Sequence, residues 1–166
     1  MLKRMAPDEV EPIVLGLEDP AFMGRVDAIM RRVLEGGDEA LTSLAVELDG
    51  LEPGSPLVLD RAAIEAAVVP TEVRSLLERT AQRIRTFAEA QLEAAADVHV
   101  PVPGGEAGHR WMAVDRAGCY APGGRFPLPS SVLMTTITAR EAGVGEIWVA
   151  SPRPGDLVCA AAAIGG

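Results

Sequence analysis

The run from Val114 to Met134, VDRAGCYAPGGRFPLPSSVLM, constrains the fold more than any other part of the chain. An apolar approach to Tyr120 is followed by a segment rich in proline and glycine, and an apolar helical pattern begins at Ser130. This order predicts a strand, a loop with a tight backbone turn, and the start of a helix. A helix start offers unpaired backbone N–H groups and the positive end of a dipole, so the connection is suited to an anion or a cofactor.

The residues that follow repeat this pattern of strand and helix. The expected helix 130–141 is closed by Gly143, EIWVA at 146–150 reads as a short buried strand, and Asp156 is expected to cap an alanine-rich last helix. Strand, helix, strand and helix are the beginning of an α/β unit with parallel strands. So small a sheet leaves an unpaired strand edge and uncovered apolar surface, and we therefore expect a homodimer or a larger homo-oligomer.

Upstream of this unit, apolar residues recur at helical spacing. Asp19-Pro20 is a helix-start signal, and Gly36-Gly37 separates a first helix from a second that should pack against it as an antiparallel pair. Asp60 is expected to cap a short helix, and Pro70-Thr71 opens the longest helix, which runs to about Ala95.

After the longest helix, the apolar period changes from helical to two. This change predicts a strand over residues 98–102, a glycine-rich loop over 104–108 and a second extended run over 110–114, which together form a β-hairpin. The expected domain organisation is an N-terminal arm (1–19), a helical region with a β-hairpin (20–115), and the start of a Rossmann-like α/β unit (116–166).

Composition narrows the class of protein. Apolar residues make up 48% of the 166 residues but aromatic residues only 4%, so a core must be built mostly from Ala, Leu, Val and Ile. The net charge of −9 argues against a nucleic-acid partner, which would require a basic surface. The N-terminus lacks the apolar segment of a signal peptide, and the longest uncharged run, 126–139, is shorter than the about 20 residues that span a membrane. We expect a cytoplasmic protein with no membrane partner, in which Cys119 and Cys159 are reduced core residues.

Few side chains suggest catalysis or metal binding. His99 and His109 are the two histidines of the chain, and neither has carboxylates or thiols at ligand spacing, so we expect no zinc site. Ser130 and Ser131 are better explained as helix caps than as nucleophiles, because no general base accompanies them. No residue is therefore assigned a catalytic or metal-ligating role.

The Pro122-Gly123-Gly124 loop has two interpretations. It is a strand-to-helix connection in which the glycines permit positive φ, or it holds a ligand. The spacing is not GxGxxG, and the acidic residue expected at the end of a second Rossmann strand is missing. The residues alone favour the structural interpretation.

Several runs, taken together, resemble a known family. They are GGDEAL at 36–41, RIRTF at 83–87, DRAGCYAPGGRFPLPSSVLM at 115–134, and AREAGVGEIWVASPRPGD at 139–156. From about Phe22 onward the chain resembles the N-terminal part of histidinol dehydrogenases. The positions of the central motif that agree are Arg116, Gly118, Tyr120, Pro122, Gly123, Gly124, Pro129, Ser130, Ser131, Val132, Leu133, Met134, Ala142, Gly143 and Val144.

The resemblance implies a fold and an activity. The fold is α/β, with an incomplete Rossmann-like unit of the histidinol and aldehyde dehydrogenase kind, in an intertwined dimer. The activity is the NAD-dependent oxidation of L-histidinol to L-histidine in histidine biosynthesis, with a bound zinc. The tyrosine of the motif contacts NAD in the family, and this role passes to Tyr120. The candidate cofactor-binding residues are Tyr120, Pro122, Gly123, Gly124, Ser130 and Ser131.

The chain also departs from the family pattern. It contains no Glu-His dipeptide, which the family uses for acid–base chemistry, and the family's zinc ligands lie further downstream. Three hypotheses stay open. The chain is a short or truncated relative that is inactive by itself, binding NAD weakly or not at all and no zinc; or it is one half of a split dehydrogenase, complemented by a C-terminal chain; or it is a non-catalytic oligomeric or ligand-binding module.

Overall fold

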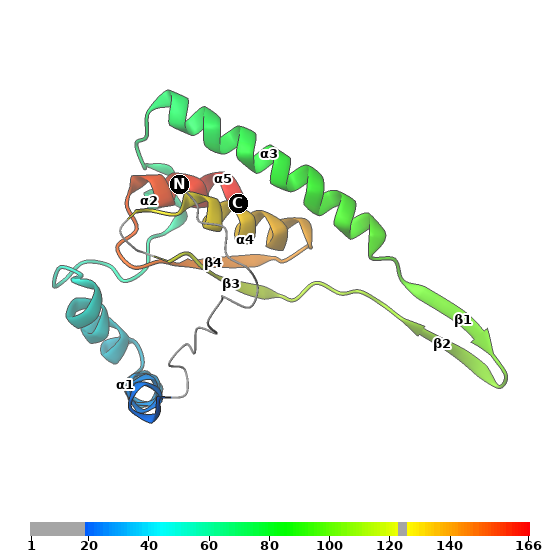
Figure 1. Ribbon diagram of the computed structural model, residues 1–166, viewed down its shortest axis with the longest axis horizontal. Helices are drawn as coiled ribbons and strands as arrows, with labels where there is room; N and C mark the ends of the chain where they lie inside the picture. Colours follow the sequence, from blue (N-terminus) through cyan, green and yellow to red (C-terminus); the bar gives the residue numbers. More distant parts are fainter. Residues whose placement is uncertain (1–18, 123–125) are drawn as a thin grey trace, which may run out of the picture. The chain divides into compact units, whose positions relative to one another are not determined.

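The computed structural model describes residues 19–122 and 126–166 (Figure 1). The described chain forms two compact units, one ending at Leu48 and one from Asp49 to Gly166. Apart from Asp19, the arm expected over residues 1–19 lies outside the described residues. No helix among the described residues is long and apolar enough to cross a membrane.

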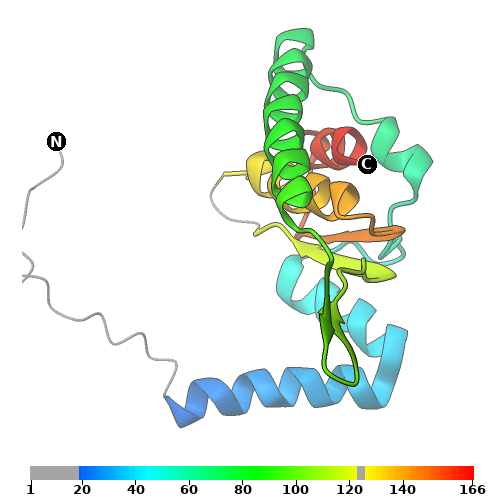
Figure 2. The same ribbon diagram turned by 90° about the vertical axis from the view of Figure 1, so that its right-hand side faces the viewer.

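The first unit is built by α1 (Pro20–Asp49), which is broken at Gly37. Gly37 has φ 54° and ψ −140°, a conformation that does not fit a helix and that glycine adopts without the penalty of a Cβ. The expected break between two helices is thereby confirmed. Figure 2 shows the second segment turning back at an angle to the first, and Arg32 joins them through Glu47 Oε2 and Ser43 Oγ, both at 2.8 Å.

The second unit begins with α2 (Arg61–Glu65) and α3 (Thr71–Ala94). Asp60 caps α2 as expected, since its carboxylate accepts a hydrogen bond from the backbone N–H of Ala63 at 2.8 Å. Pro70 directly precedes α3, where its fixed φ and missing N–H cost the helix nothing. The sequence therefore predicted both helices.

A β-hairpin of β1 (Val98–Val102) and β2 (Gly105–His109) follows α3. The hairpin was expected, but the position of its second strand was wrong: β2 occupies the predicted loop, and residues 110–114 are irregular. The reason is the turn at Pro103-Gly104, where Gly104 has φ 89°. Two residues suffice to reverse the chain when the second is a glycine with positive φ, so pairing starts at Gly105.

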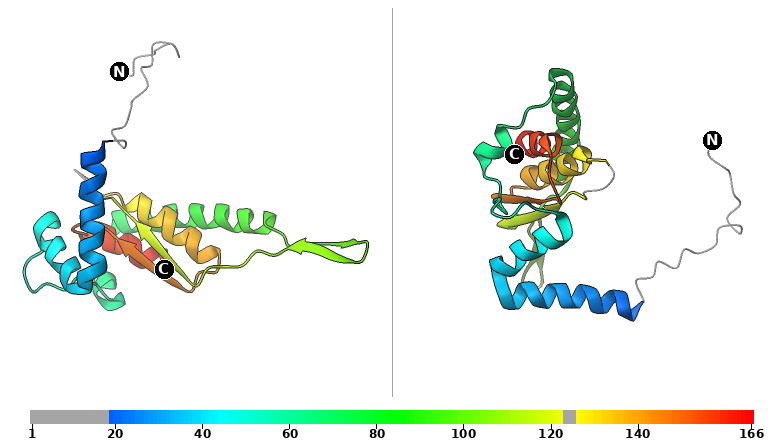
Figure 3. Two further views of the ribbon diagram at one scale, coloured as in Figure 1. Left: turned by 90° about the horizontal axis from the view of Figure 1, so that it is seen from below. Right: turned by 90° about the vertical axis from the view of Figure 1, so that its left-hand side faces the viewer.

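The last part of the chain is a parallel strand pair, β3 (Arg116–Tyr120) and β4 (Glu146–Ala150), with α4 (Pro129–Glu141) between them and α5 (Asp156–Gly165) after β4. Figures 1 and 3 show α4 and α5 on the same side of the sheet. The expected fold class is confirmed: a helical region with a β-hairpin leads into an incomplete α/β unit.

Two local expectations for this unit were wrong. The strand β4 is not buried on both faces, because exposed and half-buried residues alternate along it and Trp148 is half exposed. Helices cover one face of the sheet, so every second side chain points away from them. The cap of α5 is Gly155, and Asp156 is its first helical residue.

The core lies among α3, α4 and α5. Val132, Leu133 and Ile137 of α4 are fully buried and pack with Ala160 and Ala161 of α5. The core is built from small aliphatic residues, as the scarcity of aromatic residues predicted. The buried residues of this cluster are Ala67, Leu77, Ala81, Ala121, Val132, Leu133, Ile137, Val158, Cys159, Ala160 and Ala161.

Candidate functional site

The strands β3 and β4 end together, at Tyr120 and Ala150, and both following helices begin from this edge of the sheet. The pairing continues one residue further, because the N–H of Ala121 donates to the carbonyl of Ala150 at 2.9 Å. In open parallel sheets, ligands bind outside the carboxyl ends of the strands. We refer to this region as the carboxyl edge, and of the predicted site residues it contains Tyr120, Pro122, Ser130 and Ser131.

Tyr120 is displayed at this edge. Its side chain is 63% exposed, whereas those of its neighbours Cys119 and Ala121 are buried among the helices. The alternation along β3 places Tyr120 on the sheet face that α4 and α5 do not cover. The ring and its hydroxyl are thus available for contact with a ligand.

The loop after Tyr120 is described only in part. Pro122 is exposed, and Gly123 and Gly124 lie outside the described residues. The sequence prediction that these glycines bind a cofactor stays a prediction. The description resumes at Phe126, shortly before α4 begins.

Ser130 and Ser131 lie in the first turn of α4 and do not cap it, which corrects the sequence interpretation. The helix starts at Pro129, and the capping position is Leu128, which makes no side-chain capping hydrogen bond. Proline is favoured at the first helical position because its φ is preset, and this moves the helix start one residue ahead of the serines. The Ser131 N–H donates to the carbonyl of Leu128 at 3.1 Å.

The N-termini of α4 and α5 differ in charge. The first turn of α4 has no acidic residue, whereas that of α5 contains Asp156. A carboxylate there compensates the positive end of the helix dipole and repels an anion. Of the two helix starts at the carboxyl edge, α4 is therefore the better suited to a phosphate or carboxylate group.

Arg153 is a residue at this edge that the sequence interpretation missed. It follows β4, is exposed, and has φ 49°, the one positive φ of a non-glycine residue in the described part of the chain. Such a conformation costs about 1–3 kcal/mol and is concentrated at functional sites. The sequence carries no direct signal for it, because Pro154 favours an extended backbone with negative φ at the residue before it.

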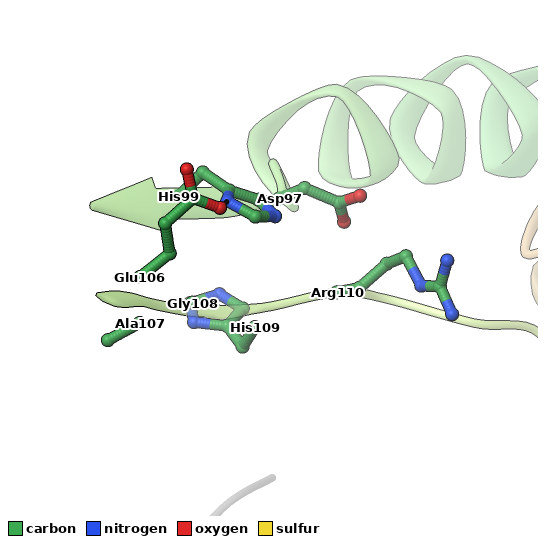
Figure 4. Close-up of a pocket in the computed structure, with 7 residues that line it drawn as sticks. All are labelled: Asp97, His99, Glu106, Ala107, Gly108, His109 and Arg110. Atoms are coloured by element: carbon green, nitrogen blue, oxygen red, sulfur yellow. Dashed lines mark ion pairs between the residues drawn. The ribbon is translucent and has the colours of Figure 1, made fainter. Parts of the chain in front are cut away.

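A separate shallow hollow of about 260 Å³ lies on the β-hairpin (Figure 4). His99 Nδ1 lies 3.5 Å from Glu106 Oε2 there, and both side chains are largely exposed. His99 pairs with Gly108, so the next residue, His109, lies on the other face of the hairpin. Among the described residues, no three His, Cys, Asp or Glu side chains are grouped so that they could hold a metal.

Both cysteines are buried and free, as expected for core residues. Burial raises the pKa of the Cys159 thiol above its usual value of 9.0, and the negative charge of Asp156 raises it further, while a backbone hydrogen bond acts in the opposite direction. The thiolate is the nucleophilic form of cysteine, so Cys159 is not suited to nucleophilic chemistry at neutral pH.

With this geometry established, the chain can be compared with known proteins. The family model for histidinol dehydrogenase matches residues 17–166. The chain belongs to the histidinol dehydrogenase family.

Its similarity to individual histidinol dehydrogenases covers nearly all of this chain but a minor part of theirs. The protein from Pseudomonas putida is 38% identical over 159 residues, which are 90% of this chain and 36% of the relative. The protein from Chromobacterium violaceum is 39% identical over 157 residues, again 90% of this chain and 36% of the relative. The chain thus spans about a third of the length of these curated histidinol dehydrogenases.

The solved structure of histidinol dehydrogenase from Elizabethkingia anophelis has the same fold. It aligns with a TM-score of 0.73 over 87% of this chain and 34% of that chain, at 22% sequence identity. The helical region, the hairpin and the incomplete α/β unit are therefore histidinol dehydrogenase architecture.

Proposed function

We propose that this chain is a histidinol-dehydrogenase-like protein that supplies the Tyr120 side of an NAD site and does not catalyse the family reaction by itself. The observation that carries the proposal is the carboxyl edge, where an exposed Tyr120 follows β3 and the first turn of α4 is free of acidic residues. Membership of the histidinol dehydrogenase family supports NAD as the ligand of this edge. The resemblance of the motif implies that Tyr120 is the tyrosine that contacts it.

The residues at the edge fit a dinucleotide in part. NAD, when bound, supplies the acceptor for the hydride that leaves the alcohol. Tyr120 would contact it through its ring and hydroxyl. The backbone N–H of Ser130 and the hydroxyls of Ser130 and Ser131 would meet a phosphate oxygen. Pro122, Gly123 and Gly124, which stand between Tyr120 and α4 in the sequence, are the further candidate contacts.

The described residues do not fit a catalytic zinc. Such a site needs three protein ligands, and no suitable group of three occurs among residues 19–122 and 126–166. His99 and His109 belong to the hairpin and not to the carboxyl edge. Acid–base catalysis needs a group within hydrogen-bond reach of the reacting atoms, and neither histidine is at the proposed site.

One observation favours a second candidate, in which the chain is half of a split dehydrogenase. The described sheet at the carboxyl edge has two parallel strands, β3 and β4, and each has its outer edge unpaired. Parallel sheets are normally larger and covered on both faces. A complementing chain with the remaining parallel strands would extend this sheet and add the missing acid–base group and zinc ligands.

NAD binding can be tested by calorimetric titration of the purified chain, with Phe87→Ala as the matched control. Phe87 is an aromatic residue of α3 with an exposure of 66%, close to that of Tyr120. We expect Tyr120→Ala to weaken NAD binding at least tenfold, while Phe87→Ala has no effect. Absence of NAD binding by the parent chain, or equal binding by parent and Tyr120→Ala, would refute the cofactor role.

The catalytic part of the proposal needs a second experiment. The chain alone should give no NADH from L-histidinol and NAD. Adding the remaining two thirds of the Pseudomonas putida protein as a separate chain tests the split enzyme. NADH formation that requires both chains would favour that candidate, whereas NADH formed by this chain alone would contradict the proposed inactivity.

A further inference from the structure

The outer face of α3 carries a group of polar side chains that the proposed NAD site does not use. They are Arg79, Gln82, Arg83 and Thr86, and they line a shallow hollow of about 420 Å³. The spacing i, i+3, i+4 and i+7 places them on one side of a helix with about 3.6 residues per turn. We call these four residues the arginine cluster.

The arginine cluster faces away from the core. Leu77, Ala81 and Ala88 are the buried residues of α3, on the side where this helix lies along α4 and α5 (Figure 1). The helical period puts the cluster about half a turn away from them, and all four of its residues are exposed. The hollow is therefore open to a ligand, and substitutions in it leave the packing of α3 unchanged.

The positive charges of the cluster are not compensated by the chain. Arg61, Arg85 and Arg116 of the second unit each form an ion pair with a glutamate, but among the described residues no carboxylate pairs with Arg79 or Arg83. None of the positions three or four residues away from either arginine holds a carboxylate. Like charges at i and i+4 destabilise a helix. An anion bound between the two guanidinium groups would turn this repulsion into attraction.

The other two side chains of the cluster also present donors. The carbonyl oxygen of Gln82 accepts a hydrogen bond from Arg85 Nη1 at 3.4 Å, and its amide nitrogen donates to Thr86 Oγ1 at 3.5 Å. Because the Thr86 hydroxyl accepts this bond, its own proton remains to be donated. A guanidinium group has donors and no acceptor. The hollow thus offers N–H and O–H groups from four side chains, which suits an anion with several oxygens.

Two glutamates limit the length of this anion. Glu72 and Glu93 are exposed and lie on the same side of α3, seven residues before Arg79 and seven residues after Thr86. Seven residues of an α-helix rise about 10 Å, so a carboxylate stands beyond each end of the arginine cluster. A long polyanion such as a nucleic acid would meet both carboxylates, and the net charge of −9 also disfavours it. A compact anion fits between the glutamates.

We propose that the arginine cluster binds a phosphoryl group, as inorganic phosphate or as the phosphate of a small phosphomonoester. The phosphate oxygens would accept hydrogen bonds from Arg79 and Arg83, whose paired N–H groups match this geometry, and from the Gln82 amide and the Thr86 hydroxyl. A carboxylate has two oxygens for these four side chains, whereas a phosphoryl group has three. The cluster belongs to α3 and not to the carboxyl edge, so this inference does not depend on the proposed NAD site.

The test is calorimetric titration of the full chain with sodium phosphate at an ionic strength held constant with sodium chloride. The parent should bind phosphate saturably. Arg79→Gln and Arg83→Gln should each raise the dissociation constant roughly tenfold, because each removes charge-assisted hydrogen bonds and keeps a good helix former. Glycerol 3-phosphate distinguishes the two sources: tighter binding than phosphate indicates a phosphomonoester, and weaker binding indicates inorganic phosphate.

Arg110→Gln is the matched control, because Arg110 is an exposed arginine outside the cluster and the same charge is removed. This variant should bind phosphate like the parent. Tyr120→Ala should also bind phosphate like the parent, and Arg83→Gln should bind NAD like the parent, which separates this inference from the cofactor proposal. Circular dichroism should show the same helix content throughout, since all the exchanged side chains are exposed.

Three results would overturn the inference. One is a parent chain that binds no phosphate at tens of millimolar. Another is phosphate binding that persists unchanged when Arg79→Gln and Arg83→Gln are combined, because the phosphate would then lie elsewhere. The third is a DNA oligonucleotide that binds more tightly than phosphate and loses affinity in Arg83→Gln, because the cluster would then be part of a nucleic-acid surface.

Discussion

Gly165 of α5 lies so close to Thr136 of α4 that a β-carbon on Gly165 would overlap the Thr136 hydroxyl oxygen and come within 3.1 Å of its Cβ. Thr136 is 1% exposed, and its hydroxyl donates to the carbonyl of Val132 at 2.8 Å. The hydroxyl cannot turn away without losing this buried hydrogen bond. The two helices therefore meet at a point where only glycine fits.

This contact predicts whether a substitution at Gly165 stabilises or destabilises the fold. Gly165→Ala would gain helix propensity, but we expect it to lower the free energy of unfolding by about 1–3 kcal/mol because of overpacking. Thr136→Ala in the same chain removes the clashing oxygen and should restore part of the loss. Gly118→Ala is the control, because a Cβ there meets no atom within 4 Å. Urea denaturation measures all four proteins, and a Gly165→Ala variant as stable as the parent would contradict the packing described.

A second prediction concerns the ion pair between α3 and α4. Arg85 Nε lies 3.0 Å from Glu141 Oε1, and the two side chains are partly buried (32% and 21% exposed), whereas those of the Arg61–Glu65 pair of α2 are about half exposed. A double-mutant cycle to alanine should give a coupling of about 1 kcal/mol for Arg85 and Glu141, and less than about 0.5 kcal/mol for the exposed pair. Equal coupling free energies would show that the difference in burial between the two ion pairs has no effect on their strength.

The raised pKa of Cys159 predicts a dependence of stability on pH. A thiol whose pKa is higher in the folded than in the unfolded chain favours folding while it is protonated. This contribution is fully present below the unfolded pKa of about 9 and is lost as the pH rises towards the folded pKa. Between pH 8 and 10 the parent should therefore lose more stability than Cys159→Ala, as thermal melts would measure. If the melting temperatures of the two proteins fell equally with pH, the raised pKa of Cys159 would be contradicted.

Zinc analysis tests the inference that the described residues contain no zinc site. We expect the chain, purified without chelators and dialysed, to retain far less than one zinc per chain, because the described residues contain no suitable group of ligands. Elemental analysis by mass spectrometry is the measurement. Stoichiometric zinc that is lost in His99→Ala or His109→Ala would place a site on the hairpin.

The sequence predicted the elements whose ends carry strong local signals. Asp60 fixed the start of α2 and Pro70 that of α3, because a side-chain cap and a proline act within one helical turn. The break at Gly36-Gly37 was predicted for the same reason, since few residues other than glycine tolerate the φ of Gly37. The parallel pairing of β3 and β4 followed from the helix between them.

The sequence misplaced features that depend on competition between neighbouring signals. Residues 104–108 contain three glycines and were predicted to be a loop, yet Pro103 and Gly104 reverse the chain and Gly105–His109 pairs with β1. Gly108 is needed within this strand, because a Cβ at this position would overlap the carbonyl oxygen of Val98. Ser130 and Ser131 read as caps, but the neighbouring Pro129 fixes the helix start. The exposure of Trp148 depends on which face the helices cover, and EIWVA contains no information about that.

The sequence predicted where Tyr120 lies in the fold, whereas its role as a cofactor contact stays a prediction. Tyr120 was identified through its motif and lies at the carboxyl edge as the strand–helix order predicted. Arg153 was missed because its unusual backbone angle arises from the turn as a whole and not from the identity of one residue.

The left-handed Arg153 has a kinetic consequence for the carboxyl edge. Pro152 and Pro154 fix the backbone on either side of it, so the turn after β4 has little conformational freedom left to lose. An anion that binds at this edge would contact the guanidinium of a residue whose backbone is already ordered. Ordering of the turn would therefore not limit the rate of binding. The rate of association should then follow ionic strength, as expected for an encounter steered by charge.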